Sequence, residues 1–220
     1  MRSEIKAVIF DFDGTILDTE TAWYDAYCEV LAPYEVTLSL AEFAGYIGTY
    51  SQEFNQFLEK QTKGEKSQEE IRDLALTIHR KKMEEIVIRE GVLEYLKEAK
   101  KLGLKIGLAT SSTKEWLLPF LEKHKIRDYF EVIQTRDDVE KVKPHPALYL
   151  NVVQLMGILP EEAVAFEDSV NGLKAAIAAG IKCTIIPNPA TETLIFENYH
   201  LKLSSMKEKP LREVISCISK

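Results

Sequence analysis

Cysteine and excess positive charge are both scarce in this chain. Its three cysteines, Cys28, Cys183 and Cys217, are odd in number and form no C-x-x-C pair. Disulfide-stabilised secreted domains carry paired cysteines, so we expect no disulfide framework and a reducing compartment. The 28 lysines and arginines are outnumbered by 35 aspartates and glutamates, which gives a formal net charge of −7. This balance argues against nucleic acid or an anionic membrane as a non-specific partner.

Long apolar runs and a dinucleotide-binding glycine pattern are also missing. The first residues lead directly into a short strand-like segment and lack the apolar stretch of about 7–15 residues that a signal peptide carries. No run approaches the ~20 apolar residues that a membrane-spanning helix needs. No G-x-G-x-x-G follows the first apolar segment, which disfavours a nicotinamide enzyme. The sequence therefore predicts a soluble cytoplasmic protein.

The order of apolar and amphipathic segments predicts an α/β fold with a helical insertion. Helical patterns alternate with short apolar runs that indicate strands at 5–10, 104–109, 130–134, 163–166 and 182–187. Such alternation predicts a Rossmann-like parallel sheet with helices on both faces. Residues 19–89 show helical spacing without a convincing strand, and Ser67 with Glu70 is a capping-box signature there. We expect an α/β core, 1–18 and 90–220, interrupted by an all-helical unit, 19–89.

Two aspartates after the first strand are poorly explained by folding alone. Asp11 and Asp13 follow the apolar run directly, and Gly14 and Thr15 come next. Residues two apart in a strand point the same way, so two carboxylates there would repel each other and resist burial. They become sensible if a cation lies between them, or if one attacks a substrate while the other moves protons. A strand end running into a turn is the simpler alternative, since aspartate is common in turns.

Three more polar clusters belong to the later α/β part, namely Thr110-Ser111-Ser112, Lys143-Pro144 and Glu167-Asp168-Ser169. Each has a simpler explanation, because the first and third could cap helices and Lys143 has a rival in Lys141. In parallel sheets, however, ligands gather where the strands end, so all four clusters would converge on one edge. Carboxylates, a hydroxyl and a lysine at one place suit a phosphoryl group with Mg²⁺.

Together these motifs resemble those of the haloacid dehalogenase-like hydrolase superfamily. The residues that carry the resemblance are Asp11-Phe12-Asp13-Gly14-Thr15, Thr110-Ser111, Lys143-Pro144 and Glu167-Asp168. Their order, with a helical insertion after the first motif, is similar to the β-phosphoglucomutase-like branch, in which that insertion is a helical cap. The resemblance covers essentially the whole chain. It implies a phosphoric monoester hydrolase that acts on a small phosphorylated metabolite, as a monomer or weak dimer.

The resemblance also implies roles for the catalytic and phosphate-binding residues. Asp11 is expected to be the nucleophile, forming an aspartyl-phosphate. Asp13 is expected to protonate the leaving alcohol and then to deprotonate the attacking water. Thr110, Ser111 and Lys143 are expected to bind the transferring phosphoryl group.

A Mg²⁺ site is the cofactor site that the resemblance implies. Its expected ligands are the carboxylates of Asp11 and Asp168 and the backbone carbonyl of Asp13. Glu167 would assist, either directly or through water. The choice of metal beyond a hard divalent cation follows from the oxygen ligands alone.

Hydrolysis and mutase activity are both compatible with these motifs. Dehalogenating relatives have no use for a second aspartate at the position of Asp13, which favours phosphoryl transfer. Sugar-phosphate mutases of this branch carry a histidine where this chain has Trp23, and an arginine in a cap loop that 47–51 lacks. We therefore predict a phosphatase, with a mutase as the alternative. A phospho-accepting signalling domain is less favoured, because Asp13 supplies an acid and base for hydrolysis.

Residues of the helical unit are candidates for substrate selection. We single out Trp23 on the first helix, and Gly48 and Tyr50 in the following loop. At helical spacing, packing within the unit's own core is an equal alternative for Trp23. The phosphate ester itself stays open between sugar phosphates, small alcohol phosphates such as phosphoglycolate, and nucleotides.

Overall fold

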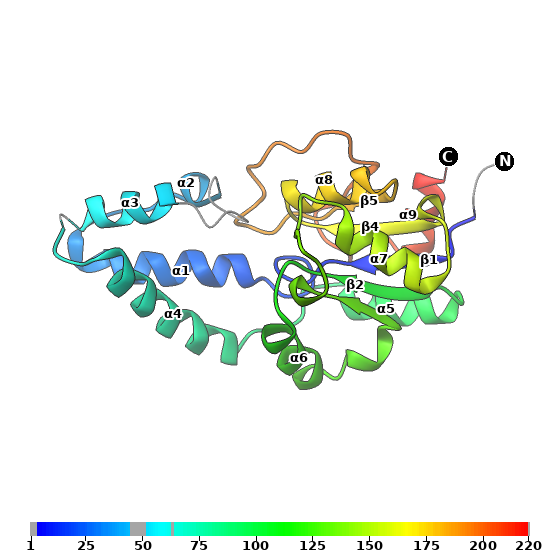
Figure 1. Ribbon diagram of the computed structural model, residues 1–220, viewed down its shortest axis with the longest axis horizontal. Coiled ribbons are helices and arrows are strands. Elements are labelled where there is room, and N and C mark those ends of the chain that lie inside the picture. Colours follow the sequence, from blue (N-terminus) through cyan, green and yellow to red (C-terminus); the bar gives the residue numbers. More distant parts are fainter. Residues whose placement is uncertain (1–3, 45–51, 63, 220) are drawn as a thin grey trace. The chain divides into compact units, whose positions relative to one another are not determined.

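The computed structural model of the chain describes residues 4–44, 52–62 and 64–219. Figure 1 shows its helices and strands in chain order. The strands are β1 (Ala7–Phe10), β2 (Lys105–Ala109), β3 (Val132–Gln134), β4 (Ala163–Glu167), β5 (Lys182–Ile185) and β6 (Leu201–Lys202). The α-helices are α1 (Thr19–Leu31), α2 (Leu40–Ala44), α3 (Gln52–Gln61), α4 (Gln68–Glu84), α5 (Val92–Lys101), α6 (Lys114–Lys123), α7 (Ala147–Met156), α8 (Val170–Ala178) and α9 (Leu211–Ile218). Short 3₁₀ turns are η1 (Ala32–Tyr34), η2 (Arg127–Tyr129), η3 (Arg136–Asp138) and η4 (Pro160–Glu162).

The chain divides into two compact units. The α/β unit comprises Met1–Leu17, Val87–Pro187 and Ile195–Lys220, and the helical unit comprises Asp18–Ile86 and Asn188–Leu194. The helical unit therefore includes a short segment from late in the chain, which the residue pattern alone did not indicate.

A parallel sheet forms the centre of the α/β unit. Within the described residues its strand order is β3-β2-β1-β4-β5-β6, and each neighbouring pair is parallel. Phe10 at the end of β1 is in register with Leu108 of β2 on one side and with Phe166 of β4 on the other. The ends of β1, β2 and β4 consequently lie side by side at one edge of the sheet.

Helices cover both faces of this sheet, as the α/β pattern predicted. On one face the ring centroids of Phe166 and of Tyr95 in α5 lie 5.3 Å apart. On the other face Gly107 of β2 lies against α7, where a Cβ on the glycine would come within 2.6 Å of Val152 Cγ1. Strands covered on both faces must be apolar throughout, which explains why all four residues of β1 are fully buried. The predicted fold class is confirmed, and β6 is an addition to it.

The helical unit has an apolar core of its own. Ala26 and Leu31 of α1 and Ile71 and Ala75 of α4 are buried together in one cluster. Ser67 and Glu70 form the predicted capping box at the start of α4. Among the described residues, no helix combines the length and apolar character that crossing a membrane requires.

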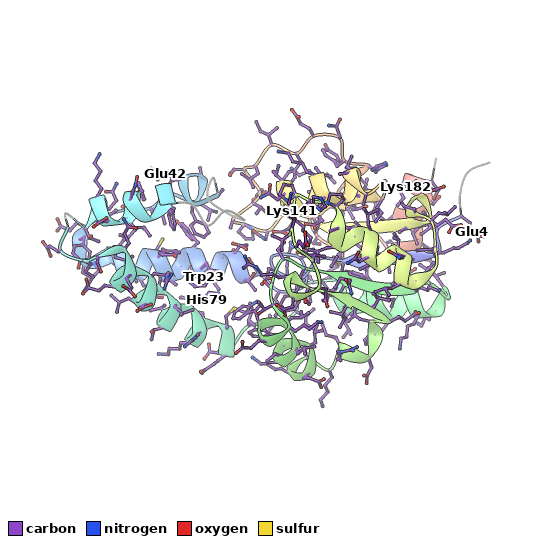
Figure 2. The ribbon with its side chains drawn as sticks, viewed as in Figure 1. Glu4, Trp23, Glu42, His79, Lys141 and Lys182 are labelled. Carbon is purple, nitrogen blue, oxygen red and sulfur yellow. The ribbon has the colours of Figure 1, made fainter. Side chains whose placement is uncertain are left out.

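Trp23 of α1 contacts His79 of α4 within this unit (Figure 2). Their rings stack with centroids 3.8 Å apart and planes 10° from parallel. His79 is fully buried. Burial lowers the pKa of His79 to about 4, although a hydrogen bond with the Thr19 backbone acts in the opposite direction. The imidazole is therefore neutral at physiological pH.

Candidate active site

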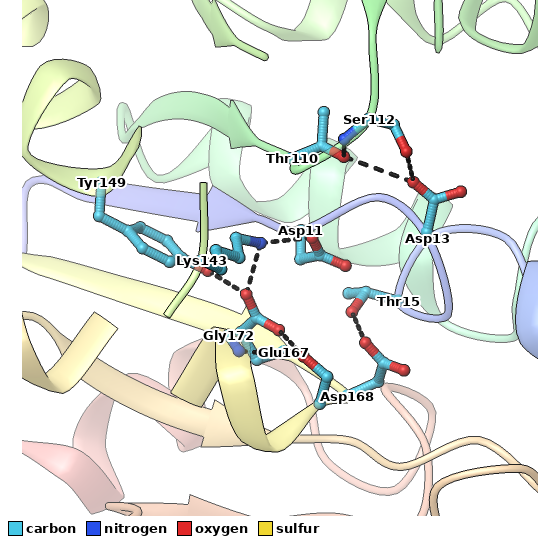
Figure 3. Close-up of polar contacts among 11 residues, drawn as sticks. Asp11, Asp13, Thr15, Thr110, Ser112, Lys143, Tyr149, Glu167, Asp168 and Gly172 are labelled. Atoms are coloured by element: carbon cyan, nitrogen blue, oxygen red, sulfur yellow. Dashed lines mark hydrogen bonds and ion pairs between the residues drawn. The ribbon is translucent and has the colours of Figure 1, made fainter. Parts of the chain in front are cut away.

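Asp11 lies where β1 ends and its carboxylate points into a cluster of charged side chains (Figure 3). The Asp11 backbone N–H donates to the Phe166 carbonyl at 3.0 Å, which extends the β1–β4 ladder by one residue. The Asp11 side chain is almost entirely buried. A carboxylate in such a place requires a compensating cation or hydrogen-bond donors.

Lys143 supplies that cation to two carboxylates at once. Its Nζ donates to Asp11 Oδ1 at 2.5 Å and to Glu167 Oε1 at 2.6 Å. Glu167 is the last residue of β4 and is fully buried. The Tyr149 hydroxyl of α7 also donates to Glu167 Oε1, at 2.5 Å. Through these short charge-assisted hydrogen bonds, side chains link the end of β1 to the end of β4.

The protonation of this cluster reflects its burial. Burial raises the pKa of Asp11 to about 7, the Glu167 carboxylate acts in the same direction, and the Lys143 ammonium opposes both. Burial lowers the pKa of Lys143, but attraction by the Asp11 and Glu167 carboxylates outweighs it and raises that pKa above its usual value. Lys143 therefore stays charged across the physiological pH range.

A third carboxylate, that of Asp168, completes the cluster. Thr15, in the turn after β1, donates its hydroxyl to Asp168 Oδ1 at 3.2 Å. Each of Asp11, Glu167 and Asp168 offers a carboxylate oxygen, and these oxygens all lie within 4.8 Å of one another. Three buried carboxylates exceed the single positive charge that Lys143 brings to them. An all-oxygen donor set with excess negative charge fits a hard divalent cation such as Mg²⁺.

Asp13 faces a different group of side chains. Asp13 Oδ2 accepts from the Ser112 hydroxyl at 2.6 Å and from the Thr110 hydroxyl at 3.4 Å, and Asp13 Oδ1 accepts from Trp116 Nε1 at 2.9 Å. Gly14, which follows, has a φ of 80°, a left-handed conformation that turns the chain back under the strand end. The two aspartates therefore have separate partners, as two separate chemical roles would require.

The structure brings most of the sequence-predicted site residues to one edge of the sheet. Asp11, Glu167, Asp168 and Lys143 form the charged cluster, and Thr110 is buried beside Asp13. Ser111 follows Thr110 at the end of β2 and is half-buried. The Asp13 side chain does not join the charged cluster, and the predicted use of its carbonyl as a metal ligand stays a prediction.

The other predicted residues separate into two groups. Lys141, the rival of Lys143, is exposed, whereas Lys143 is buried against Asp11. Trp23 belongs to the helical unit and stacks on His79. Gly48 and Tyr50 lie outside the described residues.

Several residues of the site escaped the sequence reasoning. Tyr149 and Gly172 contact Glu167, and Trp116 contacts Asp13. Arg89 donates to the carbonyls of Gly14, Ile186 and Pro187 and so ties the loop after β1 to the segment after β5. Ser112 also contacts Asp13, and the sequence did indicate this residue, because it belongs to the polar cluster after β2.

Comparison with known proteins agrees with this geometry. Residues 8–186 match the family model described as haloacid dehalogenase-like hydrolase. The chain belongs to the haloacid dehalogenase-like hydrolases. It is 48% identical over 209 residues to YhcW of Bacillus subtilis (strain 168), with 94% of each chain covered. The predicted family membership and enzymatic nature are thereby confirmed.

Other members of this hydrolase family carry the names of phosphatases. Hexitol phosphatase B of Escherichia coli (strain K12) is 30% identical over 216 residues, covering 96% of this chain and 97% of the relative. A phosphorylated carbohydrates phosphatase of Thermotoga maritima is 31% identical over 179 residues, covering 81% and 83%. A family hydrolase from Deinococcus radiodurans R1, solved with bound phosphate and sodium, superposes with a TM-score of 0.81 at 27% identity, covering 98% of this chain and 97% of that one.

Proposed function

We propose that this hydrolase is a Mg²⁺-dependent phosphatase of small phosphate monoesters, of the sugar-phosphate class, which acts through an aspartyl-phosphate on Asp11. The observation that carries the proposal is the buried cluster of Asp11, Glu167 and Asp168 with Lys143 at the ends of β1 and β4. Burial of an uncompensated charge costs on the order of several kcal/mol, so three buried carboxylates beside one lysine favour a bound cation. The names of the hexitol and carbohydrate phosphatases support the substrate class.

The first step transfers the phosphoryl group to the protein. An Asp11 carboxylate oxygen attacks phosphorus, the ester P–O bond breaks, and Asp13 gives a proton to the departing alcohol oxygen. Lys143, Thr110 and the Ser111 backbone N–H bind the equatorial phosphoryl oxygens and stabilise the charge that spreads over them. Lys143 is suited to this role because it is held charged beside Asp11.

The second step hydrolyses the aspartyl-phosphate. Water attacks phosphorus, Asp13 takes the proton from the water, and the bond between phosphorus and the Asp11 oxygen breaks to release phosphate. The donors on Asp13 come from Ser112, Thr110 and Trp116, so its carboxylate is held away from the Lys143 cluster. Asp13 can therefore exchange protons while Asp11 is covalently occupied.

Asp11 and Asp168 would hold Mg²⁺ together with the Asp13 backbone carbonyl, with Glu167 assisting. When bound, the ion supplies positive charge that favours the ionised carboxylates and offsets the negative charge of the phosphoryl group. The burial of Asp11 and its raised pKa indicate why such a charge is needed at this place.

The helical unit is proposed as the cap that selects the leaving group. Trp23, Gly48 and Tyr50 are its proposed selectivity residues. Trp23 stands where sugar-phosphate mutases of this branch carry a histidine, which favours hydrolysis over mutase activity.

Phosphate release from a panel of esters tests the proposal. Sorbitol 6-phosphate, glucose 6-phosphate, phosphoglycolate and a nucleoside monophosphate are compared with Mg²⁺ and with EDTA. We expect Mg²⁺-dependent release, highest for the sugar and hexitol phosphates, that disappears in Asp11→Asn and persists in Asp128→Asn, a change at an exposed carboxylate. Conversion of one sugar phosphate into its isomer without free phosphate would support a mutase instead and would overturn the proposal.

A further inference from the structure

The Trp116 side chain touches Asp13 and belongs to none of the predicted motifs. Its Nε1 donates to Asp13 Oδ1 at 2.9 Å, while Ser112 donates to the other carboxylate oxygen at 2.6 Å. We propose that Trp116 is a positioning residue that orients the Asp13 carboxylate for proton transfer to the leaving group. The proposal rests on the phosphatase function proposed above and adds a residue to it.

The hydroxyl donors to Asp13, Ser112 and Thr110, differ from the Trp116 indole in what they can fix. A hydroxyl such as that of Ser112 rotates to follow an acceptor, so it accommodates several orientations of the carboxylate. An indole has one N–H, which lies in the ring plane and points in one direction. The orientation of the Trp116 ring therefore sets the place of Asp13 Oδ1, and the Ser112 hydroxyl adjusts to Oδ2.

The Trp116 ring is itself fixed by its neighbours. The Thr113 side chain accepts from the Trp116 backbone N–H at 3.3 Å and so caps α6 at this turn. The Trp116 ring lies edge-on to Phe120, with centroids 5.0 Å apart and planes at 63°. The ring centroids of Phe120 and Phe12 lie 6.2 Å apart, and Phe12 is the residue between the two aspartates. The indole is thus held by the same segment of backbone that carries Asp13.

The segment that carries Ser112 and Trp116 is anchored at Ser112 and at Lys114. The Ser112 carbonyl accepts from the Arg136 backbone N–H at 2.9 Å. The Lys114 backbone N–H donates to Asp137 at 2.8 Å, and the Lys114 ammonium pairs with Asp138 at 2.6 Å. A donor on a rigid element positions a catalytic group more narrowly than a donor on a free loop. This rigidity favours a positioning role over a chance contact.

The dependence of rate on the leaving group distinguishes positioning from packing. An alkoxide leaves poorly unless Asp13 delivers a proton, whereas p-nitrophenolate leaves readily without one. Misplacement of Asp13 should therefore slow the hydrolysis of an alkyl phosphate more than that of an aryl phosphate. A purely structural loss would slow both to the same extent.

Trp116→Phe keeps an aromatic ring and removes the indole N–H together with the five-membered ring that carries it. We expect kcat/KM for sorbitol 6-phosphate to fall by on the order of tenfold and that for p-nitrophenyl phosphate by less than about threefold. Tyr95→Phe is the matched control, because it removes one aromatic donor, the hydroxyl that contacts the Lys209 carbonyl at 2.8 Å, away from the cluster. The control should leave the ratio of the two kcat/KM values unchanged.

Equal losses on both esters, or none, would overturn the positioning role while the native protein still hydrolyses both. A native protein that hydrolyses neither ester would instead overturn the proposed phosphatase function. The two failures are therefore distinguishable.

The contact itself can be read without substrate. The chain has two tryptophans, so a ¹H–¹⁵N spectrum contains two indole N–H signals, and the one that Trp116→Phe removes belongs to Trp116. In Asp13→Ala we expect this signal to move upfield and its hydrogen exchange to accelerate, while the Trp23 signal stays in place and reports that the helical unit is folded. A Trp116 signal that does not move would overturn the inference.

Discussion

The backbone of Gly172 lies directly against the carboxylate of Glu167: a methyl group on the glycine would come within 1.8 Å of Glu167 Oε2. Glu167 cannot yield freely, because Lys143 and Tyr149 hold its other oxygen at 2.6 and 2.5 Å. Gly172 lies in the first turn of α8. Close packing of this helix on the end of β4 therefore contributes to the complete burial of the Glu167 side chain.

Gly172→Ala should therefore destabilise the chain although alanine is the better helix former. Propensity alone would favour alanine by about 1 kcal/mol. The clash with Glu167 should outweigh this and lower the free energy of unfolding by about 1–3 kcal/mol, measured in urea. In a Glu167→Ala background the same change should cost much less, because the obstructing carboxylate is gone. An equal cost in both backgrounds would contradict the proposed clash.

Removal of the shared cation should destabilise the α/β unit. Lys143→Met leaves Asp11 and Glu167 buried without their common partner, and we expect a loss of about 3–5 kcal/mol at pH 7 in urea unfolding without Mg²⁺. Because the pKa of Asp11 is about 7, this carboxyl is already protonated at pH 5, and the loss should be smaller there. Lys141→Met, at an exposed neighbour, should change stability by less than about 0.5 kcal/mol. Equal losses from Lys143→Met at both pH values would count against the shared ion pair.

Mg²⁺ should stabilise the native chain through Asp168. At ten times its dissociation constant a ligand that binds only the folded state adds about 1.4 kcal/mol, seen as a rise in Tm. Asp168→Ala should lose most of this gain, and EDTA should reverse it in the native chain. Asp128→Ala, at an exposed carboxylate, should keep the full gain. The same Mg²⁺ effect in Asp168→Ala and in the native chain would exclude Asp168 as a ligand.

Acid should weaken the helical unit through His79. The pKa of His79 is lowered to about 4 in the folded chain, against about 6.5 when unfolded, so the unfolded state binds the proton first as pH falls. The stability from the neutral imidazole is complete above pH 6.5 and is lost progressively as the pH falls to about 4, by roughly 3 kcal/mol in all. His79→Phe keeps a ring against Trp23 and should flatten this part of the pH profile in urea unfolding. An unchanged slope in the variant would assign the acid sensitivity to other groups.

The sequence was sufficient for elements with strong local signals. The predicted strands at 104–109 and 163–166 agree with β2 and β4 to within one residue, and the Ser67–Glu70 capping box is present. β6 was missed because two residues at a sheet edge carry no periodicity, and the 188–194 segment because its membership in the helical unit depends on tertiary packing.

The site was predictable where chemistry repeats at strand ends. Asp11 and Glu167 meet because β1 and β4 are parallel neighbours in the sheet. Lys143 reaches both carboxylates from the segment that precedes α7. Trp116 and Tyr149 were not predictable, because each is an aromatic residue at an ordinary helical position whose polar atom is directed by packing. Periodicity identifies a buried aromatic residue, but it does not indicate where its N–H or O–H points.

The hydrogen bond from Thr15 to Asp168 joins residues 153 positions apart, across the central pair of strands. During synthesis the first aspartates emerge long before β4, so the ligand set for a cation is assembled only after most of the chain has been made. Contacts of such long range form late in folding, since the intervening chain must be ordered first. Mg²⁺ should consequently stabilise the folded state without assisting its formation. We expect it to slow unfolding and to leave the folding rate unchanged.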